Sequence, residues 1–468
     1  MMRSMFSAVS GLRAHQLRMD AIGNNIANVN TVGYKASRVT FQEVFNQTLR
    51  GAGSPQAGLG GTNPQQIGLG MNVSSMDTFH IRGAVERTDY NTDMMINGDG
   101  FFIVSDDADF LSRSYTRAGS FALDRDGNLV TPDGYRVLGY MADENGVLAS
   151  NLEGVVISKA QTFDAKKTDF VGYDGNLNSE KPTIDGSPFT QVFGGVGDPS
   201  VYNFVEDPDP DVPGGTLTIA QGAEDYVARE TTFEVYDQLG GIHRIKQVFV
   251  KNSEAGDSPT TFAVETFYLH RNGLVSRFEA GDFTGGPVEI AFGENGRFTV
   301  DGTAEDVQLQ IGAAFTNGAG DFDFNVNFSN LTMFANESTA SAPNIDGFKQ
   351  GSLIDFSVAS TGEIRGFFDN GENRIIGRVA LANFRNPAGL EKTGGNLYRV
   401  TNNSGQAMVG TPGSGGMGSL NPGAVEMSNT DLSREFTNMI TTQRGFQANS
   451  RIISTSDEML QELVNLKR

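Results

Sequence analysis

The stretch MMRSMFSAVSGLRAHQLRMDAIGNNIANV, residues 1–29, repeats apolar side chains at a helical spacing. One column recurs every seven residues and a second column follows it by three positions: Met5, Leu12, Met19 and Ile26, then Ala8, His15, Ile22 and Val29. His15 is the only polar member of the second column. This heptad pattern predicts an amphipathic helix over residues 4–29 that packs against another helix.

The C-terminal end of the chain carries a second seam with the same period. Its apolar side chains are Leu432, Met439, Phe446, Ile453 and Leu460, with Phe436 and Val464 beside the column. A strict seven-residue repeat requires a helical partner, so we expect the two terminal helices to pair. Asn429 or Thr430 can cap the second helix, and Asp431 suits the positive end of its dipole.

Polar side chains interrupt the second seam at Gln443, Ser450 and Asp457. A lone helix pair with so narrow a seam would be marginal. We therefore expect the terminal helices to gain order by packing against neighbouring subunits. The alternative is that both helices belong to an ordinary globular bundle, which the roughly 400 residues between them disfavour.

The sequence between the helices is typical of antiparallel β structure. Apolar and β-branched runs occur at 101–104, 121–123, 136–140, 232–236, 242–251, 261–270 and 375–384. Asp-Gly and Asn-Gly pairs such as Asp126-Gly127, Asp174-Gly175 and Asn272-Gly273 favour the positive φ of hairpin turns. The predicted fold class is therefore multi-domain α+β, with a terminal helical coiled coil and nested, mainly antiparallel β domains between its helices.

Charge is distributed unevenly along the 468 residues. The whole chain has a formal net charge of −21, and residues 151–352 contribute 30 acidic and 12 basic side chains, a net −18. Charge of one sign keeps surfaces apart and soluble, so this middle segment is expected to face solvent. An overall acidic balance argues against nucleic acid as a partner.

The sequence contains no recognisable catalytic or metal-binding motif. It has no cysteine, and its four histidines are isolated, so thiolate nucleophiles and paired zinc ligands are excluded. A glycine-rich match at residues 413–418 lacks the strand and helix that a dinucleotide site needs. No stretch approaches a transmembrane span. We expect no enzyme activity, no cofactor, no metal site and no membrane insertion, although a secreted β-rich enzyme or adhesin stays as the alternative of another class.

Several segments resemble the bacterial flagellar rod and hook proteins. They are IGNNIANVNTVGYK (22–35), INGDGFFIV (96–104), YTRAGSFALDRDGNLVTPDGYRVLGY (115–140), GRVALANFRNPAGLEKTGGNLYRVTNNSG (377–405) and the C-terminal run from Ser428. The matching motif residues are Asn24, Asn25, Asn28, Gly33, Tyr34, Lys35, Gln443, Arg444 and Gly445. About 200 residues inserted at 151–352 favour the hook members of this family, with a distal rod subunit as the alternative.

The resemblance implies a structural subunit of an extracellular helical tube that curves and transmits torque as a universal joint. It also implies an organisation in layers, with the helical layer at 1–30 and 428–468 and a connecting segment at 31–71 and 420–427. An inner β domain at 72–150 and 353–419 and an acidic outer domain at 151–352 would follow. The subunit-packing residues would be Met5, Leu12, Met19, Ile22, Ile26, Leu432, Phe436, Met439, Phe446, Ile453 and Leu460.

The partners implied by the resemblance are other copies of the same chain, the flagellar rod, the hook–filament junction proteins, the hook cap and the flagellar type III export apparatus. Some members of the family cross-link adjacent subunits through a cysteine-derived bond. Because this chain has no cysteine, its cohesion is expected to be non-covalent.

Overall fold

The chain divides into two compact units that are nested in the sequence. The computed structural model describes residues 2–466 apart from 56–57, 59, 144–145, 161, 185–190, 196–198, 207–213, 253–259, 279–282, 285–287, 300–305, 314–315 and 317. Unit 1 consists of residues 1–161, 354–367 and 373–468, and unit 2 of residues 162–353 and 368–372. Unit 2 is thus an insertion within unit 1.

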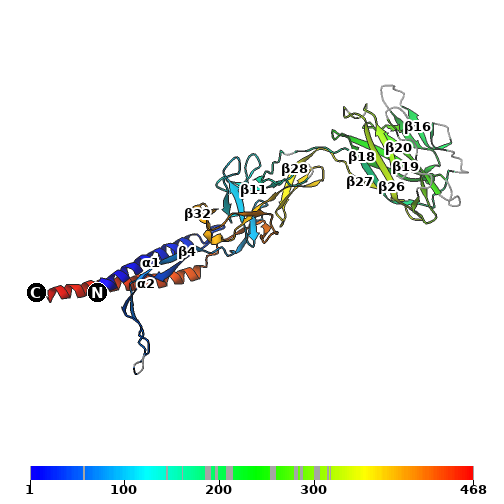
Figure 1. Cartoon of the computed structure of the whole chain (residues 1–468). Helices are drawn as coiled ribbons and strands as arrows, with labels where there is room; N and C mark the ends of the chain where they lie inside the picture. Colours follow the sequence, from blue (N-terminus) through cyan, green and yellow to red (C-terminus); the bar gives the residue numbers. More distant parts are fainter. Residues whose placement is uncertain are drawn as a thin grey trace. The chain divides into compact units, whose positions relative to one another are not determined.

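Two long helices lie at the ends of the chain, α1 (Met2–Ala27) and α2 (Leu432–Asn465), and they contact each other in unit 1 (Figure 1). This confirms the predicted pairing of the terminal helices. α1 begins and ends two residues before the predicted bounds, because the chain turns away through Asn28 and reaches Gly33 at a φ of 70°. Such a positive φ stops a helix and favours glycine.

The predicted cap of α2 was wrong by one or two residues. Asp431 is the N-cap, and its side chain accepts a hydrogen bond from the Arg434 backbone N–H at 3.2 Å. Asn429 does not cap the helix because its amide is used elsewhere: its Oδ1 accepts from the Ala36 N–H and its Nδ2 donates to the Phe79 carbonyl. Thr430 instead receives a hydrogen bond from the Ser428 hydroxyl.

The β structure of unit 1 is a sheet with small strand pairs beside it. The sheet runs in the order β28 (Gly351–Val358), β29 (Glu363–Phe368), β30 (Asn373–Val379), β11 (Arg136–Met141), β7 (Phe101–Ser105), β8 (Ser114–Thr116), β33 (Leu397–Arg399) and β32 (Glu391–Gly394). Branching from it are β9 (Ala122–Leu123), β10 (Leu129–Val130), β12 (Glu153–Gly154), β31 (Leu381–Asn383) and β34 (Met408–Gly410). Its core contains Phe101, Tyr115, Leu138, Phe384 and Tyr398.

Four two-stranded pairs complete unit 1, and all of them are antiparallel. They are β1 (Ser37–Glu43) with β4 (Met71–Thr78), β2 (Asn46–Arg50) with β3 (Gln65–Gly68), β6 (Met94–Asn97) with β35 (Ser419–Pro422), and β5 (Val85–Arg87) with β36 (Ala424–Glu426). The last two pairs join the segment before α2 to the N-terminal third of the chain, so both helices emerge from one region.

Unit 2 is built from two sheets that share a core. One sheet runs β22 (Phe283–Thr284), β25 (Asp306–Ile311), β26 (Phe322–Phe334), β14 (Phe170–Asn178) and β27 (Ser341–Ile345). The other runs β15 (Gln191–Gly195), β16 (Ser200–Glu206), β17 (Gly215–Ile219), β21 (Val275–Arg277), β20 (Thr260–Leu269), β19 (Ile242–Lys251) and β18 (Val227–Tyr236), with β23 (Val288–Phe292) and β24 (Phe298–Thr299) beside it.

The ring of Tyr173 on β14 lies at the centre of this shared core. It stacks on Phe328 of β26 with a centroid distance of 5.2 Å and meets the edge of Phe249 on β19 at 5.5 Å. All three side chains are essentially inaccessible to solvent. Because the core draws on strands of both sheets, the two sheets pack face to face.

Two local expectations were wrong. The run 375–384 forms two strands, since β30 pairs with β11 and β29 whereas β31 pairs with β7 and β34. Asp174-Gly175 is not a hairpin turn: it lies inside β14 beside a break in register, and Gly175 takes a φ of 119° there. Asp126-Gly127 and Asn272-Gly273 do connect antiparallel neighbours, β9 with β10 and β20 with β21.

Candidate functional site

The two terminal helices are antiparallel and approach closely through glycine. A Cβ placed on Gly11 of α1 would lie 2.8 Å from the Asn449 Nδ2 atom of α2, and one placed on Gly445 would lie 2.9 Å from the His15 ring. Contacts this short are excluded for a real side chain. At each glycine, an added methyl group would have to displace a polar side chain of the partner helix.

Small side chains occupy most of the seam between the helices. The buried positions of α1 are Ala8, Gly11, Ala14, Ala21, Ile22 and Asn25. On α2 the buried positions are Thr442 and Ser456, with Asn449 half-buried midway between them. These three α2 residues are themselves seven apart, in a column beside the one that was predicted.

The larger predicted residues sit at the margin of this seam. Ile22 is buried, while Met5, Leu12, Met19, Ile26, Met439, Phe446, Ile453 and Leu460 are half-buried. Leu432 and Phe436 are exposed, with 39% and 50% of their surface accessible. Among the motif residues of α2, Gly445 faces His15 whereas Gln443 and Arg444 are exposed.

Further large apolar side chains of both helices face outward. On α1 they are Met2, Phe6, Val9 and Leu17, and on α2 they are Leu432, Phe436, Ile440, Ile452, Met459 and Val464. Exposed apolar surface concentrated on one part of a molecule marks an interaction site. We call these outward side chains the apolar helix faces.

The asparagine motif forms the turn that follows α1. Asn25 is buried, and its Oδ1 accepts hydrogen bonds from the Tyr34 hydroxyl at 3.1 Å and the Ser37 N–H at 2.9 Å. Asn24 donates to the same hydroxyl at 3.2 Å, and Asn28 donates back to the Asn24 carbonyl. Gly33 has a backbone conformation and a close approach to Ala118 that a side chain would oppose. The motif thus holds the chain in its path away from the helix.

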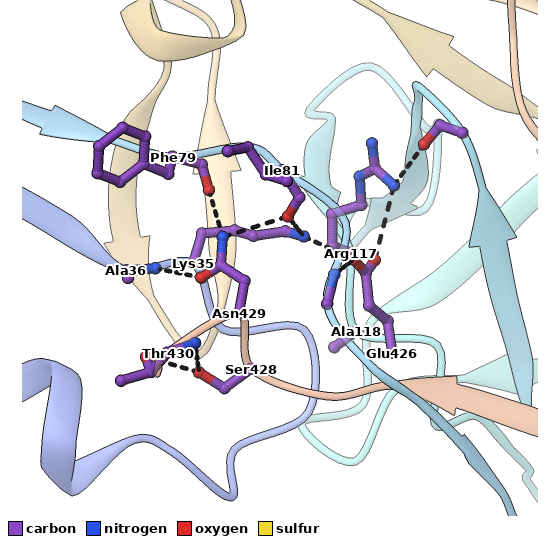
Figure 2. Close-up of polar contacts among 12 residues, drawn as sticks. Lys35, Ala36, Phe79, Ile81, Arg117, Ala118, Glu426, Ser428, Asn429 and Thr430 are labelled. Atoms are coloured by element: carbon purple, nitrogen blue, oxygen red, sulfur yellow. Dashed lines mark hydrogen bonds and ion pairs between the residues drawn. The ribbon is translucent and has the colours of Figure 1, made fainter. Parts of the chain in front are cut away.

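A buried ionic cluster of Lys35, Arg117 and Glu426 adjoins this turn (Figure 2). The Lys35 Nζ donates to Glu426 Oε1 at 2.6 Å and to the Ile81 carbonyl at 2.8 Å, and an Arg117 Nη1 lies 3.6 Å from Glu426 Oε2. At most 3% of any of these three side chains is accessible. Burial lowers the pKa of Lys35, and the Glu426 carboxylate opposes that shift.

The cluster connects segments that are distant in sequence. Lys35 and Glu426 are 391 residues apart, and the Glu426 Oε1 also accepts the Gly83 N–H at 2.7 Å. Asn429 extends the connection, since it bonds Ala36, Phe79 and Ile81 in the same region (Figure 2). These contacts anchor the start of α2 beside the end of α1.

Sequence reasoning named Lys35 but missed its partners Glu426 and Arg117. Neither partner is near Lys35 in the chain, and a single acidic residue after a charge-free stretch carries no periodic signal. The one available hint is that Glu426 ends the charge-free run 400–425 and lies just before the α2 cap.

No helix of the described part of the chain is long and apolar enough to cross a membrane. Within the same residues, no three His, Cys, Asp or Glu side chains are grouped so that they could hold a metal ion.

Four family descriptions match successive parts of the chain. "Flagella basal body rod protein" matches residues 5–35, "Flagellar hook protein FlgE/F/G D1 domain" 95–171, "Flagellar basal body protein FlaE D2 domain" 210–348 and "Flagellar basal body rod FlgEFG protein C-terminal" 421–466. Paired terminal helices around nested β structure, together with these matches, define a structural protein of the flagellar rod and hook class.

Full-length relatives narrow this class. The chain is 37% identical over 480 residues to the flagellar hook protein FlgE of Borreliella burgdorferi and 37% identical over 501 residues to that of Treponema pallidum. The flagellar basal-body rod protein FlgG of Bacillus subtilis is 29% identical over 469 residues. All three alignments cover 100% of both chains. The chain belongs to the flagellar hook protein family, as the quoted motifs predicted.

Membership settles the broad function. The chain is a structural subunit of the bacterial flagellar hook, an extracellular structure, and not an enzyme. Membership of this family also implies that the subunit polymerises with copies of itself within the flagellum.

Proposed function

We propose that the apolar helix faces are the surface through which the subunit polymerises into a curved tube. This tube acts as a universal joint that passes torque from the rod to the filament. The observation that carries the proposal is the distribution of small and large side chains on α1 and α2. Small residues fill the seam between the helices, whereas Phe6, Phe436 and Ile440 remain exposed at 68%, 50% and 52%.

Burial of these side chains supplies the driving force. Covering a large apolar side chain is worth about 1.5–3 kcal/mol, so a few contacts per subunit offset the entropy of ordering a neighbour. Non-covalent contacts also suit a joint whose subunits must rearrange as it turns. The absence of cysteine fits that requirement.

The layered organisation predicted from the resemblance is part of this proposal. Residues 1–30 and 428–468 form the inner helical layer, and 31–71 with 420–427 connect it to an inner β domain at 72–150 and 353–419. Residues 151–352 form the outer layer. The net charge of −18 on that segment, against −3 on the remainder, supports an outward position.

The two charge-free stretches, 51–76 and 400–425, serve as sliding contacts at or beside the connecting layer. A charge buried between moving surfaces would cost several kcal/mol each time its partner moved away. Singly placed Asp or Lys residues in these stretches should therefore impair assembly or bending. Tubes that assemble and curve normally would contradict this role.

The partners in this scheme are copies of the chain, the rod, the hook–filament junction proteins, the hook cap and the flagellar type III export apparatus. The support for the last four is the resemblance of the terminal motifs. Nucleic acid and membrane insertion have no part in the scheme.

The decisive experiment places a charge on an apolar helix face of the full chain. Phe436→Asp and Ile440→Asp should abolish tube formation, as seen by sedimentation and electron microscopy, while the β units stay folded by circular dichroism. Leu239→Asp is the matched control, because Leu239 is a comparably exposed apolar residue of unit 2 at 68%. Tubes formed equally well by all three variants would refute the proposal.

A further inference from the structure

Within the described residues, the register of the helix pair leaves the end of α2 without a partner on α1. Gly11 faces Asn449 and His15 faces Gly445, so the residue numbers of each facing pair total 460. Extrapolating at the same rise per residue, Met2 is level with about residue 458. Residues 459–466, which we call the α2 overhang, thus extend past the start of α1, as the red end of α2 does in Figure 1.

One face of the overhang carries an acidic side chain between two apolar ones. Met459, Glu462 and Leu466 are spaced by three and four residues, which places them on the same side of a helix. Met459 and Leu466 are exposed at 45% and 82%, and Glu462 is exposed between them. An overhang with this much apolar surface is incomplete in a single chain.

A groove on unit 1 has a complementary arrangement, with a basic side chain among apolar ones. It lies between α1 and the start of β4 and has a volume of about 520 Å³, and its lining on α1 is Phe6, Val9, Ser10, Arg13, Ala14 and Leu17. Four of these, Phe6, Val9, Arg13 and Leu17, follow a single stripe of the helix at spacings of three and four. All four are exposed, and the positive Arg13 lies between the apolar side chains.

We propose that the α2 overhang of one copy occupies the α1–β4 groove of a second copy. Glu462 then pairs with Arg13, and Met459 and Leu466 pack against Phe6, Val9 and Leu17. The overhang is roughly 10 Å long and the stripe about 16 Å long at 1.5 Å per residue, so the overhang is short enough to lie along the stripe. This inference names the contacting segments of the polymerisation surface and therefore rests on the proposed function.

The occupant must come from another molecule. The overhang continues the line of α2 beyond Met2, whereas the groove lies along residues 6–17 of α1, so a straight α2 cannot reach its own groove. A contact between two different surfaces is heterologous. Repeated, such a contact generates a ring or an open helical filament instead of a closed dimer, which is the outcome a tube requires.

Charge exchange tests the pairing on the full chain. Arg13→Glu and Glu462→Arg should each raise the concentration needed for assembly by about tenfold or more, and the double variant should restore assembly toward the unmodified level. Helical circular dichroism of each variant verifies that the chain is folded. A double variant no better than the weaker single variant, or single variants that assemble normally, would overturn the inference.

Cysteine pairing provides a direct measurement because the chain has no cysteine of its own. Assemblies mixed from Arg13→Cys and Glu462→Cys chains should form a covalent heterodimer on mild oxidation. The control mixture replaces Arg13→Cys with Leu239→Cys, an exposed position of unit 2 outside the helix faces and the groove. Cross-linking no stronger than in the control would exclude the contact.

The overhang contact and the proposed function can be disproved separately. If Phe436→Asp blocks assembly but the charge exchange and the cross-link fail, the helix faces still mediate assembly and only the overhang contact is wrong. If Phe436→Asp and Ile440→Asp assemble normally, the proposed function fails as well.

Discussion

The helix pair of unit 1 and the two packed sheets of unit 2 differ in where they place their large apolar side chains. In unit 2 the large apolar residues face each other across two sheets, and Tyr173, Phe249 and Phe328 are inaccessible to solvent. In the helix pair the buried residues are mostly small, whereas Phe6, Phe436 and Ile440 are exposed. One region buries its large apolar side chains within the chain, and the other leaves several of them exposed.

The comparison teaches that size, and not hydrophobicity alone, decides which residues face inward on a helix. Close approach at Gly11 and Gly445 leaves no room for Phe or Leu between α1 and α2. Large residues on these helices should consequently matter for assembly, whereas those of unit 2 should matter for folding.

Tyr173→Ala should destabilise unit 2 by about 3–5 kcal/mol, the range for removing a buried aromatic ring from a core. Hydrogen exchange in peptides that cover β14 would report the loss. Phe170→Ala is the control on the same strand, because Phe170 is 42% exposed and should change stability by less than about 0.5 kcal/mol. Equal effects of the two substitutions would break the comparison.

Glu426→Gln should destabilise the junction between the helices and the β structure of unit 1 by about 3–5 kcal/mol, since it leaves Lys35 and Arg117 buried without a counter-charge. Thermal unfolding followed by helical circular dichroism measures this. Arg87→Ala, which removes the exposed pair between Arg87 and Asp89 at 4.0 Å, should have almost no effect. If Glu426→Gln melted at the same temperature as the unmodified chain, the cluster would not be needed for stability.

Unit 1 should become less stable at low pH because His80 becomes protonated. The His80 ring packs against Phe101 and Tyr398. Burial, reinforced by Lys35, Arg117 and Lys392, lowers the pKa of His80 from 6.5 to about 4. Because the folded pKa is lower than the unfolded one, the stabilisation is full above pH 6.5 and is lost as the pH falls toward 4.

The free energy of folding lost in this way is up to about 3 kcal/mol, at 1.36 kcal/mol per pKa unit. Hydrogen exchange of β7 and β33 as a function of pH would follow it. His80→Phe should flatten the profile between pH 6.5 and 4, and a profile that stays as steep would assign the acid sensitivity to other groups.

The smallest predicted effect separates two glycines of the same helix. Gly23→Ala should stabilise α1 by about 0.5–1 kcal/mol, because nothing lies within 4 Å of the added Cβ. Gly11→Ala should lose that gain, or reverse it, since the new methyl group displaces the Asn449 amide. Helical melting temperatures of the two variants would distinguish them, and two equal increases would mean that the seam is loose.

Much of the fold could be predicted from local pattern. The heptads indicated both helices and their pairing, and β-branched runs located β7, β11, β19 and β20 to within one residue. Heptad reasoning weights large apolar side chains, and so it identified Leu432 and Phe436 without the small-residue column at Thr442, Asn449 and Ser456. That column appears only when the partner helix is present.

Other features depend on contacts that local patterns do not encode. Asp431 caps α2 because the Asn429 amide is already bonded to the Phe79 and Ile81 carbonyls in the segment that follows β4. The Glu426 cluster is formed by side chains far apart in sequence, so no spacing rule could reveal it. Asp174-Gly175 is a dipeptide typical of turns. It lies within a strand instead, at a register irregularity, because β14 pairs with β26 and β27 on its two sides.

The bond between Lys35 and Glu426 closes a loop of 391 residues, which has a consequence for the order of events during folding. Closing a loop of that length in a flexible chain costs about 5 kcal/mol of entropy, by the logarithmic dependence on length. Unit 2 lies wholly inside the loop, and folding it first shortens the path that remains to be closed. We therefore expect the ionic cluster to form late in folding, once unit 2 has folded and shortened the loop.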